Sequence, residues 1–117
     1  MSYRTTSHEI VTDAALDALG NPVRRAMLQR LAGGQLSVGE IAAELPISRP
    51  AVSRHLSVLK NAELVTDSPS GTSRHYSLNA AGFAALRLWL DEFWTDAEAR
   101  LRLVAENTQD EVRQKNG

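Results

Sequence analysis

The chain has 117 residues, no cysteine and a formal net charge of −1. This length suits one domain with its own hydrophobic core, and the lack of cysteine excludes disulfides, thiolate metal ligands and thiol redox chemistry. No apolar run is long enough to span a bilayer and residues 1–6 carry no apolar signal segment, so we expect a cytoplasmic protein with no membrane partner.

Positive charge is concentrated in the middle of the chain. Residues 48–90 contain five Arg or Lys and two Asp or Glu, whereas residues 91–117 contain four and seven. A protein that contacts DNA with one face needs local rather than global positive charge. The middle of the chain is therefore where we expect contact with nucleic acid.

Two helices are predicted before the Gly33-Gly34 pair. Thr6 and Glu9 have the spacing of a capping box, and apolar residues follow at helical spacing as far as Gly20. Asn21 and the proline after it are typical of a cap and a first helical turn. The second helix is expected over residues 22–32, ended by the two glycines.

A helix pair with a short connection comes next. Ser37 and Glu40 form another capping box, Pro46 ends that helix, and Ser48 caps the following one. On a helical wheel the following helix has one apolar side, made by Val52, Leu56 and Leu59 together with Glu63. The opposite side carries Pro50, Ser53, Arg54, Ser57 and Asn61. Two helices joined in this way predict a helix-turn-helix whose second helix enters the DNA major groove.

A β-hairpin and a long helix complete the predicted order. Residues 64–68 and 73–78 are expected to be strands, with a turn over residues 69–72. The predicted fold class is therefore mainly α with a small β-hairpin wing (α+β), a winged helix-turn-helix. The last helix is expected over roughly residues 80–105. We predict one domain over residues 1–106 and a polar tail over residues 107–117.

From Asp13 to about Trp94 the chain resembles the winged-helix repressors of the arsenical-resistance-repressor (ArsR) family. Ordered blocks carry the resemblance: LDALGNPVRR (16–25), SVGEIA (37–42), SRPAVSRHL (48–56), LKNAELV (59–65) and GTSRHYSL (71–78). The resemblance implies a homodimer that binds double-stranded operator DNA and represses transcription. It also implies that the recognition helix enters the major groove and that the wing touches the backbone or minor groove.

The candidate DNA contacts are Arg49, Pro50, Ser53, Arg54, Ser57, Lys60, Arg74 and His75. Arg54 can pair with guanine in bidentate fashion, which is worth ~1–3 kcal/mol of discrimination. Arg49 suits a phosphate. For His55 a structural or phosphate-contacting role is favoured over base reading. Arg24 and Arg25 either reach DNA or pair within the protein, and the alternative for the whole polar helix face is an ordinary solvated surface.

The last helix has apolar residues on more than one face, including both tryptophans, which favours packing against a partner subunit. The resemblance implies that the first and last helices form this interface. The candidate interface residues are Ile10, Ala14, Leu86, Leu90, Phe93, Trp94, Ala97 and Leu101. Two DNA half-sites would then lie about one helical turn apart, ~34 Å.

The chain departs from the family's metal sensors. One motif in the family places two cysteines at the start of the third helix, where this chain has Ser37 and Gly39. Another uses Asp and His on the last helix, which here contains no histidine. We predict no metal and no cofactor. Control by repressor concentration alone is favoured; the alternative is an apolar ligand at the dimer interface, near Trp89, Phe93 and Trp94.

Two other classes of function remain as alternatives. One is a winged-helix module that binds a protein and has no DNA specificity, which the net charge of −1 allows. The other is an enzyme, which is disfavoured because the sequence shows no nucleophile elbow, phosphate loop, metal pair or carboxylate dyad.

Overall fold

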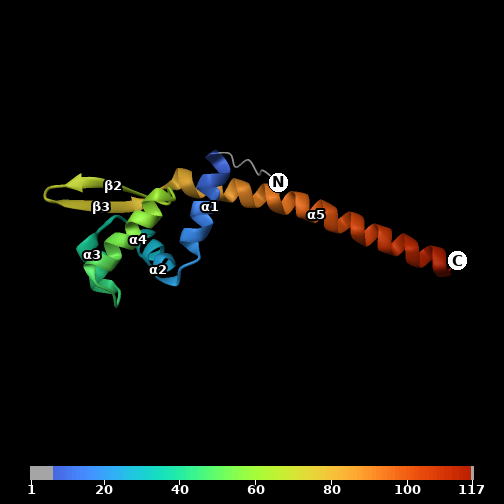
Figure 1. The fold of residues 1–117 in the computed structure, drawn as a ribbon, viewed down its shortest axis with the longest axis horizontal. Helices are drawn as coiled ribbons and strands as arrows, with labels where there is room; N and C mark the ends of the chain where they lie inside the picture. Colours follow the sequence, from blue (N-terminus) through green and yellow to red (C-terminus); the bar gives the residue numbers. More distant parts are fainter. Residues whose placement is uncertain (1–6, 117) are drawn as a thin grey trace, which may run out of the picture. The chain divides into compact units, whose positions relative to one another are not determined.

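The computed structural model describes residues 7–116, and their side chains over residues 12–112. In chain order the elements are α1 (Ser7–Leu19), α2 (Pro22–Leu31), β1 (Leu36–Ser37), α3 (Val38–Glu44), α4 (Arg49–Asn61), β2 (Val65–Ser70), β3 (Ser73–Leu78) and α5 (Ala80–Asn116). The contacts divide the chain into two compact units, Met1–Leu86 and Arg87–Gly117. The order of elements confirms the predicted winged helix-turn-helix (Figure 1). In the part of the chain that the structure describes, no helix is both long and apolar enough to cross a membrane.

Side-chain caps set the starts of three helices at the predicted residues. The Asn21 side chain accepts from the backbone N–H groups of Val23 and Arg24, at 2.8 and 3.1 Å, and α2 follows. Ser37 and Glu40 form the predicted reciprocal box at the start of α3. The Ser48 hydroxyl accepts from the third residue of α4 at 3.3 Å. The predicted Thr6 cap lies outside the described residues.

The end of α4 corrects one prediction. Glu63 does not share a helix face with Leu56, because α4 ends at Asn61 and Glu63 is left-handed, with φ of 61°. The Leu64 N–H donates to the Leu59 carbonyl at 2.9 Å, and the Glu63 N–H donates to a carbonyl of the last turn at 3.0 Å. These two bonds are the Schellman pattern that closes a helix. The helical wheel that included Glu63 therefore ran past the true end of α4.

The wing is a three-stranded antiparallel sheet in the order β1-β3-β2. Its hairpin loop is shorter than predicted, because Pro69 and Ser70 pair with β3 and only Gly71 and Thr72 turn. Pro69 is tolerated because β2 is an edge strand, and Gly71 supplies the φ of 60° that a two-residue loop favours at its first position. Strand β1 was not predicted, since two residues have no detectable periodicity.

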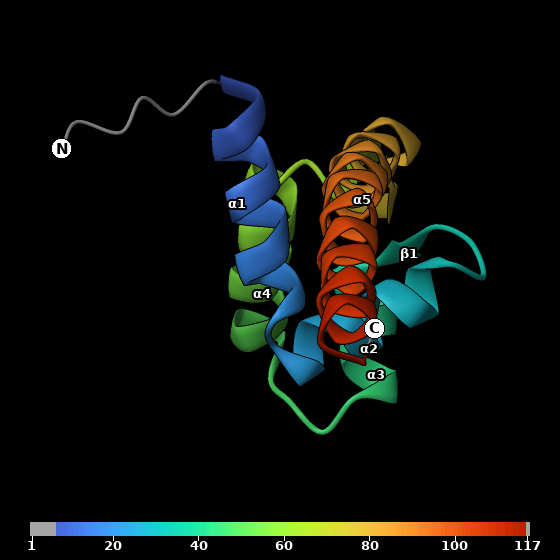
Figure 2. The same ribbon diagram turned by 90° about the vertical axis from the view of Figure 1, so that its right-hand side faces the viewer.

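The core of the first unit lies where its helices meet the sheet. The largest fully buried side chains come from α2, α3, α4, the residue before β2 and the first residue of β2: Met27, Ile41, Val52, Leu56, Leu59, Leu64 and Val65. Tyr76 and Leu78 of β3 pack against this cluster. Helix α1 lies alongside α4 (Figure 2) and contributes Ala15 and Ala18 to the same core. This packing fixes which side of α4 faces outward.

Helix α5 continues to Asn116, beyond the end predicted near residue 105. Residues 106–116 contain no glycine or proline and are mostly good helix formers, so nothing local stops the helix there. Ion pairs of Arg100 with Asp96 and of Arg102 with Glu98, each one turn apart, add support. The polar end of the chain that was predicted to be a tail is therefore helical as far as the structure describes it.

Candidate DNA-binding site

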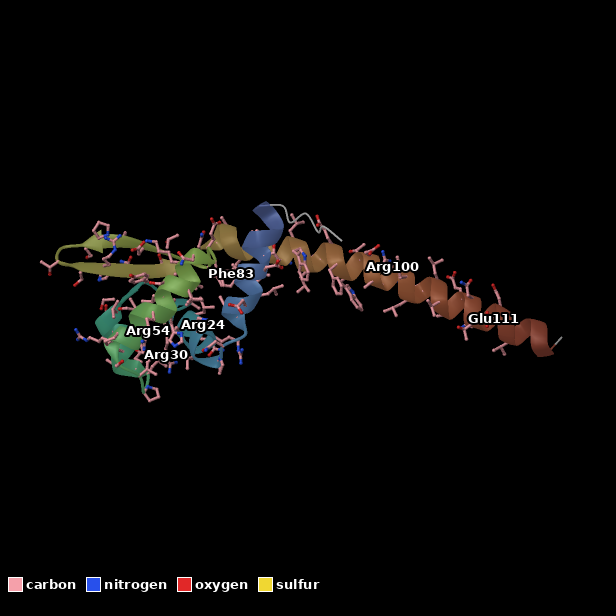
Figure 3. The ribbon with its side chains drawn as sticks, viewed as in Figure 1. Arg24, Arg30, Arg54, Phe83, Arg100 and Glu111 are labelled. Atoms are coloured by element: carbon pink, nitrogen blue, oxygen red, sulfur yellow. The ribbon has the colours of Figure 1, made fainter. Side chains whose placement is uncertain are left out.

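The outward side of α4 carries the polar residues predicted to face DNA. Ser53, Arg54 and Ser57 are exposed, whereas Val52 and Leu56 on the opposite side are 0% exposed. Arg54 lies on α4 (Figure 3), and its side chain is exposed. Among the described residues, no hydrogen bond or ion pair engages its guanidinium. The arginine best suited to base recognition therefore keeps all its donors free.

Arg49 and Pro50 occupy the first turn of α4, and both are exposed. The Arg49 guanidinium lies against α3: a Cβ built on Gly39 would be 3.0 Å from its Nη2. Within the part of the chain that is described, Arg49 makes no hydrogen bond or ion pair. It is therefore a second uncompensated cation at the outer surface of the helix pair.

Lys60 and Arg74 are both paired with one carboxylate that the sequence argument did not single out, Asp67 of β2. Lys60 Nζ lies 2.9 Å from Asp67 Oδ1, and Arg74 Nε lies 2.7 Å from Oδ2. The hydrogen bond from Lys60, followed by that from Arg74, lowers the pKa of Asp67. Asp67 in turn raises the pKa of Arg74. This triad ties the end of the recognition helix to the wing, and a phosphate at either cation must compete with Asp67.

His75 lies near the start of β3, inside the sheet rather than in the turn. It belongs to the middle strand, with Ser37 on one side and Ser68 on the other, and it is half-buried. The tip is Gly71 and Thr72.

Arg24 and Arg25 cap the end of α1. Of the two roles expected for them, DNA contact or pairing within the protein, the structure therefore shows the second. Arg24 Nε donates to the Ala18 carbonyl at 2.8 Å and its Nη2 to the Asp17 carbonyl at 3.2 Å. Arg25 Nη1 donates to the carbonyl of the last residue of α1 at 2.8 Å. Cations at this position also suit the negative end of the helix dipole.

His55 sits next to this cap rather than on the outer face of α4. It is half-buried, and its Nδ1 lies 3.5 Å from Arg24 Nη1. Burial lowers the pKa of His55, and the positive charges of Arg24 and Arg54 act in the same direction. The ring is therefore favoured in its neutral form, which can accept a hydrogen bond from Arg24.

The candidate interface residues fall in both units. Leu90, Phe93, Trp94 and Leu101 of the second unit are 54–60% exposed, an unusual state for large apolar side chains. The Phe93 ring stacks on Trp89, with centroids 5.6 Å apart. Within the first unit, by contrast, Ala14 and Leu86 pack against the core. Ala97 is half-buried, and the Ile10 side chain lies outside those described.

A capped two-faced helix after a short turn, followed by a hairpin that joins β1 in a three-stranded sheet, defines a winged helix-turn-helix DNA-binding protein. The sequence pattern described as "Bacterial regulatory protein, arsR family" matches residues 21–67. The chain is 59% identical over 85 residues to the HTH-type transcriptional regulator Rv2034 of Mycobacterium tuberculosis, covering 73% of this chain and 79% of that protein. The chain belongs to the arsR family and is a DNA-binding transcriptional regulator.

Two further comparisons agree with this assignment. The transcriptional repressor SdpR of Bacillus subtilis is 38% identical over 76 residues, which cover 65% of this chain and 84% of that protein. The solved structure of an ArsR-like transcriptional regulator from Rhodococcus sp. RHA1 superposes with a TM-score of 0.78 over 85% of this chain and 93% of that one, at 23% identity. At that identity the second likeness supports the fold alone.

Proposed function

We propose that this regulator is a homodimeric repressor that binds an operator through α4. The observation that carries the proposal is the exposed polar side of α4, on which Arg54 has no partner among the described residues. SdpR, a relative at 38% identity, is a transcriptional repressor. A repressor of this kind acts where the bacterial chromosome lies, in the cytoplasm.

The site residues divide by what each can contact. Arg54 is the base reader, since its planar fork matches the two acceptors of guanine in the major groove. Ser53 and Ser57 accompany it on the same face. The residues proposed to contact the backbone are Arg49, Pro50, Lys60, Arg74 and His75. Of the cations among them, Arg49 is free, whereas the charges of Lys60 and Arg74 are offset by Asp67.

Dimerisation is proposed through the apolar side chains of α5, with a contribution from α1. Water-exposed Leu90, Phe93 and Trp94 would be buried against the partner copy, which removes apolar surface from water at roughly 25 cal/mol per Å². Two copies of α4 would then read two half-sites ~34 Å apart.

Regulation of the repressor without a metal is supported by the kinds of metal-ligating side chain that the sequence contains. Useful affinity for transition metals needs imidazole or thiolate ligands. The chain has no cysteine, and its three histidines are spread over three parts of the sequence. Among the described residues no group of three or more His, Cys, Asp or Glu is arranged to hold a metal ion. We propose that repression is set by the concentration of the protein itself, with no cofactor and no catalytic activity.

The experiment is operator selection from a randomised DNA pool, followed by gel-shift titration of the selected site and of unrelated DNA. Arg54→Ala should weaken binding to the selected site about 5- to 150-fold, because a bidentate base contact is lost. Binding to unrelated DNA should change far less. Arg30→Ala is the matched control, because Arg30 is an exposed arginine of α2 paired with Glu44.

Affinity should also fall by orders of magnitude between ~50 and 200 mM salt. A protein that selects no sequence and binds DNA without salt dependence would contradict the proposal and favour the protein-interaction module instead.

A further inference from the structure

A polar pocket of about 300 Å³ lies between the start of α3, the start of α4 and the wing. Its lining residues are Ser37, Val38, Gly39, Arg49, Ser73 and Arg74. All of them belong to the first compact unit. The pocket is separate from the Ser53, Arg54 and Ser57 face, so base reading does not account for it.

The lining is suited to an anion. It contains two guanidinium groups and two hydroxyl groups, and no carboxylate. Within the described residues Arg49 has no hydrogen bond or ion pair, and Arg74 is engaged through Nε only, which leaves its Nη groups as donors. Ser37 Oγ accepts from the Glu40 N–H, so its own proton remains to be donated. The Glu40 carboxylate is already held by the Ser37 N–H at 3.0 Å.

Gly39 allows the close approach of Arg49. A Cβ at this position would lie 3.0 Å from Arg49 Nη2 and 3.3 Å from Cζ, tighter than ordinary packing. The absence of a side chain lets the guanidinium lie along α3 and line the pocket beside Ser37. The second arginine of the lining, Arg74, belongs to β3.

We propose that this pocket binds one phosphate group, held jointly by Arg49 and Arg74. Guanidinium groups match phosphate oxygens in bidentate geometry, and two of them with hydroxyl donors can satisfy several oxygens at once. The phosphate comes either from the operator backbone, in which case the inference rests on the proposed function, or from a free phosphate ion.

The free-ion source is tested by titrating inorganic phosphate into the full chain and following the NMR signals of the Arg49 Nε–H and the Gly39 amide. Sodium chloride at equal ionic strength is the blank. Saturable shifts are expected with phosphate alone, and Arg49→Gln should abolish the Gly39 response. Arg30→Gln, which removes an equal charge outside the pocket, should leave it intact. Unchanged melting temperatures show that both variants are folded.

The operator source is tested by a double-mutant cycle of Arg49→Gln and Arg74→Gln in gel-shift titrations. If both side chains hold one phosphate, the losses are not additive, and the salt slope of the double variant falls by about one phosphate equivalent. If they contact two phosphates, the losses add and the slope falls by about two equivalents.

The two arms separate the sources and the hypotheses. Coupling in the cycle without a phosphate response assigns the pocket to the DNA backbone, and a phosphate response with additive losses assigns it to the free ion. The inference is overturned if the cycle shows no coupling and the titration shows no phosphate response. If the wild-type protein selects no DNA sequence, the proposed function fails. The phosphate titration alone then decides whether the pocket binds a phosphate group.

Discussion

Arg54 and Lys60 lie on the same helix but in different electrostatic surroundings. Arg54 has no partner among the described residues, whereas Lys60 shares Asp67 with Arg74. A free arginine can commit its whole fork to a base, but a paired cation must first give up an existing ion pair to contact a phosphate. Similar residue types in the sequence thus differ in how readily they contact DNA.

Asp67→Asn is predicted to destabilise the protein at neutral pH, because both ion pairs depend on the carboxylate charge. The pKa of Asp67 is lowered from its ordinary value of 3.8, so its contribution is present above pH 3.8 and is lost as the pH falls through the lower folded-state pKa. Urea titrations should therefore show a difference between wild type and variant at pH 7 that shrinks towards pH 3.

The same substitution should release Lys60 and Arg74 and steepen the salt dependence of binding to unrelated DNA. Asp96→Asn, which removes a carboxylate from an exposed i,i+4 pair on α5, is the control and should do neither. An equal stability loss for Asp67→Asn at pH 3 and pH 7 would show that its charge is not what matters.

At the scale of elements, local caps and one close backbone contact hold the recognition unit together. The caps at Asn21, Ser37 and Ser48 are satisfied by neighbours within three residues. The start of α5 has a local contact too, from the Ala81 N–H to Asn79 Oδ1 at 3.2 Å, and the left-handed turn at Glu63 brings the Glu63 carbonyl against Gly82. This contact joins the end of the recognition helix to the start of α5 within the first unit.

Gly82→Ala is predicted to destabilise the protein by about 1–3 kcal/mol or more, as overpacking does in a rigid site. The added Cβ would overlap the Glu63 carbonyl oxygen, and a backbone atom cannot turn aside as a side chain can. Gly33→Ala is the matched control, because its Cβ would meet the nearest atom at an ordinary 3.5 Å. Chemical denaturation of both variants checks this, and equal stabilities would refute the contact.

At the scale of the whole molecule, apolar surface is left on α5. Leu90, Phe93, Trp94 and Leu101 are each more than half exposed. Exposure of this kind on neighbouring turns of one helix marks a surface that another chain covers. The proposed dimer accounts for these side chains as buried contacts between copies.

Trp94→Asp is predicted to convert the dimer into a monomer, since a charge would be buried without a partner in the interface. Operator binding should then weaken by roughly 100-fold or more, because the second half-site is no longer held at high effective concentration. Sedimentation equilibrium and gel shifts measure the two effects. Thr95→Asp, on the adjacent exposed residue, tests whether charge alone is responsible, and a monomeric wild type would contradict the dimer.

The predicted helices were largely right because their signals are local. The capping residues of α2, α3 and α4 lie within three residues of the groups they bind, so spacing along the chain reveals them. The predicted end of α5 was wrong because no local residue stops the helix near residue 105. The polar composition of residues 107–117 had been interpreted as a tail without helical structure. Strand β1 was missed because its two residues are a strand only when β3 lies beside them.

The amino-acid sequence alone determined the winged helix-turn-helix, the polar side of its recognition helix and the absence of thiolate donors, since these follow from spacing and residue type. Only the tertiary structure decided which cations are free. Asp67 reaches Arg74 because β2 pairs with β3, and it reaches Lys60 because β2 packs against α4. Arg49 of α4 and Arg74 of β3 line one pocket. Electrostatic partners depend on distances of a few ångströms between side chains of different elements, which helical or strand periodicity does not encode.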